Sequence, residues 1–119
     1  MNTPNYEDGD HTIKENGHVK CTFTIKDRMR EGLFTMFHPN GRIQVQGNYV
    51  KDKNQGTFEH FDADGNKTSV SQFVDGLLVG DLVEYYKDQT VKSVTPYVNN
   101  KVEGTKREFY SNGRPKSTQ

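Results

Sequence analysis

The chain has 119 residues, with 16 basic and 16 acidic side chains, and 30% of its residues are hydrophobic. This length fits one small domain. The balanced charge excludes the strong positive field typical of nucleic-acid-binding proteins. The low hydrophobic fraction disfavours a thick two-layer core. Because six Tyr and seven Phe argue against a disordered chain, we expect the apolar residues to form a thin, regular arrangement.

The first segment of the chain, residues 1–15, is acidic. It holds four acidic side chains against Lys14, a net charge of −3. Its sequence DGDHTIKE predicts a degenerate strand, with Ile13 at the position where later units carry an aromatic residue. We therefore expect residues 1–15 to form a partial repeat that caps the array.

Turn dipeptides recur along the rest of the chain at a fixed step of 24 residues. They are Asn16-Gly17, Asn40-Gly41, Asp64-Gly65, Asp88-Gln89 and Asn112-Gly113. A second series keeps the same step and consists of Gly32, Gly56, Gly80 and Gly104. A fixed step without insertions is the signature of a repeat array. The pattern defines residues 16–114 as the array and residues 115–119 as a tail.

Each 24-residue unit predicts two short strands. The leading strand, for example residues 32–39, ends at an Asn-Gly or Asp-Gly dipeptide, which favours a type I′ hairpin turn. The return strand alternates apolar and polar residues, as in residues 19–25, and Asp75-Gly76 and Asn99-Asn100 predict the reversal into the next unit. The sequence therefore predicts an all-β fold. We expect a single-layer, elongated antiparallel ribbon of about four 24-residue β-hairpin repeats with partial end repeats.

The leading strands carry apolar residues of both parities. Phe34, Phe58 and Leu82 lie two residues after a repeat glycine, whereas Phe61 and Tyr85 lie five residues after one. A regular strand places these two sets on opposite faces. We predict that Phe61 and Tyr85 are largely buried between neighbouring repeats, and that Tyr110, nearer the open end, is less so. Pro115, which cannot donate to a ladder, is expected to blunt the last edge of the sheet.

Residues 73–88 and 97–113 carry the fullest version of the repeated pattern, which is an aromatic residue, a turn, a glycine and a second aromatic residue before the next turn. This pattern resembles the MORN (membrane occupation and recognition nexus) repeat in its bacterial variant form, over residues 16–114. The resemblance implies a hairpin array, and proteins of this build include YwqK-like antitoxins and immunity-type proteins. Eukaryotic MORN arrays are scaffolds, some of them linked to phospholipids. The sequence departs from the pattern at Gln89, where the turn glycine is missing, and at Lys106, which replaces an apolar residue.

The sequence offers little for catalysis or metal binding. Residues 62–73 begin like an EF-hand loop, but Gly65 stands at position four and Phe73 at position twelve, where calcium binding needs glycine at six and an acid at twelve. The four histidines lack short metal-ligand spacing. Cys21 alternates with Val19 and Phe23, which indicates a buried structural thiol. We therefore predict no enzyme activity, no metal and no cofactor.

The last two units carry the departures at Gln89 and Lys106, and they gain aromatic and basic residues. Tyr86, Lys106, Arg107 and Tyr110 combine the residue types that dominate protein interfaces. They are the predicted partner-binding residues of a non-catalytic module that binds a protein, as an inhibitor, antitoxin or immunity-type protein would bind a toxin or effector. The alternative is a MORN scaffold associated with membranes or phosphoinositides, which should carry basic residues at repeating positions. Nucleic acid is disfavoured as a partner, and because no apolar run matches a signal peptide or membrane span, the predicted location is cytoplasmic.

Overall fold

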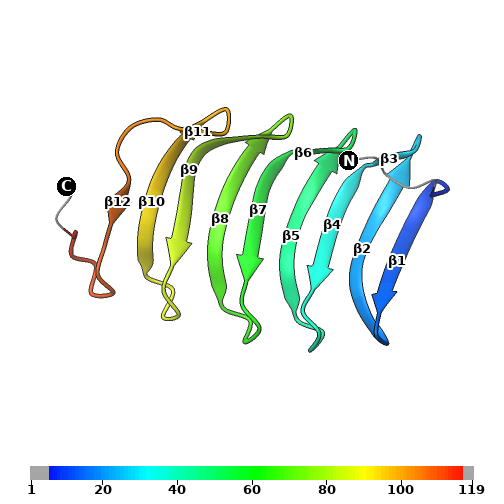
Figure 1. The fold of residues 1–119 in the computed structure, drawn as a ribbon, viewed down its shortest axis with the longest axis horizontal. Helices are drawn as coiled ribbons and strands as arrows, with labels where there is room; N and C mark the ends of the chain where they lie inside the picture. Colours follow the sequence, from blue (N-terminus) through cyan, green and yellow to red (C-terminus); the bar gives the residue numbers. More distant parts are fainter. Residues whose placement is uncertain (1–5, 117–119) are drawn as a thin grey trace.

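The computed structural model describes residues 6–116 and folds them into one open, antiparallel sheet of 12 strands (Figure 1). The strands are β1 (Gly9–Glu15), β2 (His18–Lys26), β3 (Met29–Arg30), β4 (Gly32–Phe37), β5 (Ile43–Val50), β6 (Lys53–Asn54), β7 (Gly56–Phe61), β8 (Lys67–Val74), β9 (Leu77–Tyr85), β10 (Val91–Val98), β11 (Lys101–Val102) and β12 (Arg107–Glu108). The described residues contain strands and turns and no helix. The all-β prediction is confirmed.

The strands lie side by side along the long axis of the molecule, from β1 at one end to β12 at the other (Figure 1). The principal extents are 51, 32 and 17 Å, so the molecule is long and thin. Hairpins β1–β2, β4–β5, β7–β8 and β9–β10 follow each other in chain order. The single-layer ribbon of hairpin repeats is therefore also confirmed. The four strands of two residues each, β3, β6, β11 and β12, continue or replace the leading strands.

The repeat glycines stand where the chain enters or kinks within a leading strand. Gly32, Gly56, Gly80 and Gly104 all have positive φ, between 68° and 103°. At the first three positions a side chain would meet nothing within 4 Å, so backbone conformation and not lack of space requires glycine there. The unbroken glycine series thus marks a positive-φ bend that recurs at the same position of each unit.

The two ends of the hairpins use different turns, which reverses part of the sequence prediction. At Asn40-Gly41 the Gly41 N–H donates to the His38 carbonyl, and positive φ occurs at Gly41 alone, which is a type I turn followed by a left-handed glycine. The type I′ pattern, with two consecutive positive-φ residues, occurs at Asn16-Gly17 and at all four reversals of the opposite edge. These reversals are Asp27-Arg28, Lys51-Asp52, Asp75-Gly76 and Asn99-Asn100. The predicted I′ geometry is therefore wrong for the later Asn-Gly and Asp-Gly turns.

One face of the sheet carries an aromatic stack, and we call it the aromatic face. Phe34, Tyr49, Phe58 and Phe73 follow each other in edge-to-face contacts with ring centroids 5.4, 5.8 and 5.2 Å apart. Phe58 is 4% exposed and Tyr49 is 9% exposed, although residues 6–116 form no second layer over them. Contacts between neighbouring rings therefore bury these side chains, as a second sheet would do in a β-sandwich.

The predicted burial of Phe61 and Tyr85 is wrong in degree, because both side chains are only half-buried. The ladder between β7 and β8 shifts register between His60 and Phe61, and a similar shift lies beside Tyr85 in the ladder between β9 and β10. Each ring thus sits at a bulge next to a hairpin turn, where fewer strands pack around it. Of the aromatic residues at these two positions of the leading strand, Phe58 is buried at 4% exposed, whereas Phe34, Phe61 and Tyr85 are half-buried.

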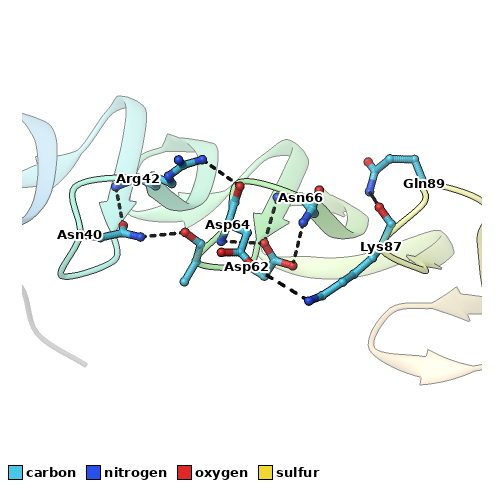
Figure 2. A network of polar contacts seen from close by, with 8 residues as sticks. Asn40, Arg42, Asp62, Asp64, Asn66, Lys87 and Gln89 are labelled. Carbon is cyan, nitrogen blue, oxygen red and sulfur yellow. Dashed lines mark hydrogen bonds and ion pairs between the residues drawn. The ribbon is translucent and has the colours of Figure 1, made fainter.

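Successive hairpins are tied together at both edges of the ribbon. At the edge shown in Figure 2, the Asn40 amide donates to the Ala63 carbonyl at 2.7 Å, and the Arg42 guanidinium donates to the Asp64 carbonyl at 2.8 Å. At the opposite edge the Asp52 N–H donates to the Arg30 carbonyl, and equivalent backbone bonds join the next two units. Each unit is therefore held by its immediate neighbours, as in other repeat proteins.

Candidate protein-binding surface

Tyr86, the first predicted binding residue, serves mainly to fasten the last hairpin. It directly follows β9, and its hydroxyl donates to the backbone carbonyl of Phe109 at 2.7 Å. The Lys92 ammonium lies 5.8 Å from the centre of the Tyr86 ring. The hydroxyl of the half-buried Tyr86 is therefore already engaged within the chain.

The other predicted binding residues are exposed at the C-terminal end of the ribbon. Lys106 precedes β12, and Arg107 begins it. Tyr110 is 53% exposed, with the Lys116 ammonium 5.2 Å from the centre of its ring. The structure thus places Lys106, Arg107 and Tyr110 together at one end of the molecule.

A row of valines crosses three adjacent strands on the side of the sheet opposite the aromatic stack. In the ladder, Val70 lies opposite Val83, and Val83 lies opposite Val94. Residues directly opposite each other in an antiparallel pair point to the same face. We call this side the valine face. Arg107 lies opposite Val94 and so extends the row at its C-terminal end.

The valine face also carries a second set of apolar residues near the edge with the type I′ turns. Val50, Val74 and Val98 stand at the same position of successive units, and they are 39%, 48% and 53% exposed. Leu77, opposite Val74, is 38% exposed. Together with the half-buried row of Val70, Val83 and Val94, they place apolar residues on this face of β5, β8, β9 and β10. Exposed apolar surface rimmed by polar groups is typical of interaction sites.

Sequence reasoning missed this surface although its signal was present. Val50, Val74 and Val98 are spaced by 24 residues, like the glycines. These valines are exposed because the aromatic stack occupies the other face of the sheet. The alternation of residues within one strand does not show which of the two faces is exposed.

Basic side chains border the valine face at its C-terminal end. Lys101 lies opposite Val98, and Arg107 lies opposite Val94; both are exposed. Asp81, opposite Pro96, is the acidic residue beside them. The Glu59 carboxylate, in line with the valine row, is paired with the Lys67 ammonium at 2.8 Å, and this pairing raises the pKa of Lys67. The valine face is therefore apolar at its centre and weakly basic at its C-terminal rim.

A polar row on the aromatic face contains residue types that could suggest catalysis. His60 lies opposite Ser69, Ser69 opposite Glu84, and Glu84 opposite Ser93. The Ser93 hydroxyl donates to the Glu84 carboxylate at 2.8 Å, and a carboxylate is ordinarily a weaker base than the histidine of a serine–histidine pair. Within residues 6–116, no group of three or more His, Cys, Asp or Glu side chains is placed to hold a metal ion.

A cleft of about 380 Å³ separates the tips of the first two hairpins. Val19, Met36, Phe37 and Pro39 line it, with Glu15 at its rim. A second hollow on the other side of the sheet shares Val19, Phe37 and Pro39. The two hollows thus belong to one gap between splayed hairpin tips, and such a gap encloses a small ligand poorly. Nearby, burial raises the pKa of the half-buried Cys21 thiol, which makes it a poor nucleophile.

One hairpin unit of the chain matches a known repeat family. Residues 30–51 match the MORN repeat variant. This segment covers one 22-residue stretch that runs through β3, β4 and β5, the leading and return strands of one unit. The glycine series and the ladders give the following units the same architecture. The match supports a MORN-repeat protein, a class that generally serves as a non-enzymatic repeat module.

No match to the chain was found among curated proteins. Within the part of the chain that the structure describes, no helix is long and apolar enough to span a membrane.

Proposed function

We propose that this protein is a non-catalytic binding module that recognises another folded protein through the C-terminal half of its valine face. The observation that carries the proposal is the exposed apolar set of Val74, Leu77 and Val98 on the sheet. A pre-organised sheet loses little conformational entropy on binding, so a modest apolar surface gives useful affinity. The single-layer architecture also offers a flat face and not an enclosed pocket, which suits a protein partner better than a small substrate.

The chemistry of the rim defines the partner further. Lys101 and Arg107 stand at the C-terminal end of the valine face, and the exposed Tyr110 follows Arg107 by three residues. A complementary partner presents apolar side chains at its centre and carboxylates at one side. In the finer form of the proposal, the protein acts as an inhibitor, antitoxin or immunity-type protein that covers a functional surface of a toxin or effector.

Two valines provide a matched pair of variants for the test. Val98 and Val102 are both 53% exposed and lie on neighbouring strands, but Val98 belongs to the valine face, while Val102, opposite Tyr97, belongs to the aromatic face. The immobilised protein is used to capture a partner from an extract of its source cells, and the purified partner is titrated by calorimetry. Val98→Asp should weaken binding by about 2 kcal/mol or more, the scale of an interface hot spot, whereas Val102→Asp should have little effect.

Other results decide against the proposal. Equal effects of both substitutions would remove the valine face from the interface. Retention on anionic vesicles that high salt abolishes, without any protein partner, would favour the membrane-associated scaffold instead. For the antitoxin form, co-expression should restore growth of cells that produce the captured toxin, and failure of Val98→Asp to reduce this rescue would contradict it.

A further inference from the structure

The two ends of the ribbon differ in how they close the sheet. At the C-terminal end, the short β12 is followed by a single bridge between Phe109 and Pro115, and Pro115 has no N–H to donate. At the other end, β1 runs for seven residues and, in the described part of the chain, pairs with β2 on one side. A long edge strand of this kind is a template for pairing with another strand.

The hydrogen-bonding groups on the outer edge of β1 follow from the ladder. The Glu31 N–H donates to the Thr24 carbonyl, so Thr24 directs its backbone groups toward β4 and away from β1. Asp10, opposite Thr24, therefore forms a pair without hydrogen bonds to β2, and its N–H and C=O point outward. Thr12 and Lys14 follow at alternate positions, so their backbone N–H and C=O groups also point outward. The register shift in this ladder falls on β2, where Lys20 is the extra residue, so β1 itself alternates regularly.

We propose that a second copy of this chain pairs with the outer edge of β1, so that two antiparallel β1 strands meet about a two-fold axis at Thr12. In this register Thr12 lies opposite Thr12 of the second copy, and Asp10 lies opposite Lys14. These are the residues whose backbone groups point outward, so each pair exchanges two N–H···O bonds. The proposal is independent of the valine face and of its partner.

The side chains complement each other in the same register. Asp10, Thr12 and Lys14 are exposed and share one face, so the pairing places a carboxylate opposite an ammonium on both sides of the axis and two threonines at its centre. Opposite charges and Thr–Thr pairs directly across an antiparallel ladder are stabilising. The neighbouring Glu15 carboxylate is paired with its own Lys20 at 3.1 Å, which reduces its repulsion of the second copy.

The segment before β1 leaves this edge accessible where the structure describes it. The Tyr6 ring contacts His11 at 4.9 Å and Phe23 at 5.4 Å between centroids. Both partners lie on the aromatic face, opposite each other in the ladder. Tyr6 is therefore placed over that face and not beside the edge of β1.

Sedimentation equilibrium tests the proposal on the full chain at concentrations from about 10 µM to about 1 mM, where small interfaces associate. The wild-type protein should form dimers, and small-angle X-ray scattering should give the dimer about twice the 51 Å length of one copy. Thr12→Pro removes an N–H that β2 does not use, and it should weaken association by about tenfold or more. Thr12→Val keeps that N–H and should still dimerise. Circular dichroism checks that both variants fold.

A charge exchange tests the register even if the proline variant fails to fold. Lys14→Glu places two acidic side chains opposite each other and should abolish the dimer, while the double variant Asp10→Lys/Lys14→Asp should restore it. A wild-type protein that stays monomeric up to about 1 mM overturns the proposal. So does a dimer of unchanged length that tolerates Thr12→Pro, because it would stack through a face of the sheet.

Discussion

Gly47 is the position where a single methyl group should disturb the ribbon most. It lies in the middle of β5 with an ordinary extended backbone, and the Phe58 ring packs directly against it. A Cβ at this position would come closer than 3.0 Å to three carbons of the ring, whereas carbon atoms pack at about 3.5–4.0 Å. Phe58 cannot yield easily, since it is 4% exposed and held between Tyr49 and Phe73.

The expected cost of Gly47→Ala follows from these contacts. Overpacking of a filled core costs about 1–3 kcal/mol, and displacement of the Phe58 ring adds part of the cost of exposing it. Alanine also lowers the conformational entropy of the unfolded chain, which stabilises the folded state by about 0.4–1 kcal/mol. We therefore expect a loss of about 2 kcal/mol in the free energy of unfolding, measured by urea denaturation with an unchanged slope. Asn48→Ala, at the exposed neighbouring residue, serves as the control and should change stability by less than about 0.5 kcal/mol.

The next unit of the chain suggests a compensating change. At the positions 24 residues after Gly47 and Phe58 stand Ser71 and Leu82, a larger residue with a smaller one. The double variant Gly47→Ser/Phe58→Leu should therefore lose at least about 1 kcal/mol less than the sum of the two single variants. Additive losses, or a Gly47→Ala variant as stable as the wild type, would refute the packing argument.

Three further predictions concern other parts of the ribbon. Phe58→Ala should cost about 3–5 kcal/mol in urea denaturation and Phe61→Ala clearly less, because Phe61 is half-buried; equal losses would contradict the assignment of the inward positions. Tyr86→Phe should cost about 0.5–1.5 kcal/mol and lower hydrogen-exchange protection near Phe109, whose carbonyl loses its donor, and unchanged protection would argue against the fastening role. The Asn66 N–H, which donates to the Asp62 carboxylate, is the main cause that lowers the pKa of Asp62, so the folded state favours the charged form. This stabilisation is present above about pH 4 and is lost as the pH falls below it, so Asp62→Asn should flatten the acid slope of stability, and an unchanged slope would disprove it.

The periodic features of the fold could be predicted from the sequence, because they depend on local backbone requirements. The glycines at Gly32 and its equivalents recur since each unit needs a positive φ at the same point, and the reversal at Asn99-Asn100 needs residues that tolerate two positive φ values in succession. Such requirements leave their mark at fixed positions, whatever the distant contacts are. The element types and their order followed directly.

Features that depend on register between strands could not be predicted in the same way. The half-burial of Phe61 results from a bulge, and the engagement of Tyr86 results from a carbonyl 23 residues away. The valines at Val50, Val74 and Val98 were visible as a series, but their exposure follows from the aromatic stack on the other side. The exposed valines were thus not predicted as a surface, and the binding role of Tyr86, Lys106, Arg107 and Tyr110 stays a prediction.

The arrangement of strands also determines how the molecule would respond to mechanical force. The described ends of the chain lie at opposite ends of the long axis, and the strands run across that axis (Figure 1). Tension applied between the termini therefore pulls neighbouring strands apart and loads their hydrogen bonds in sequence, one strand at a time, as in opening a zipper. Such a ribbon should extend in small steps at low force, beginning at an end. A protein of equal stability pulled along its strands would resist until many bonds broke together.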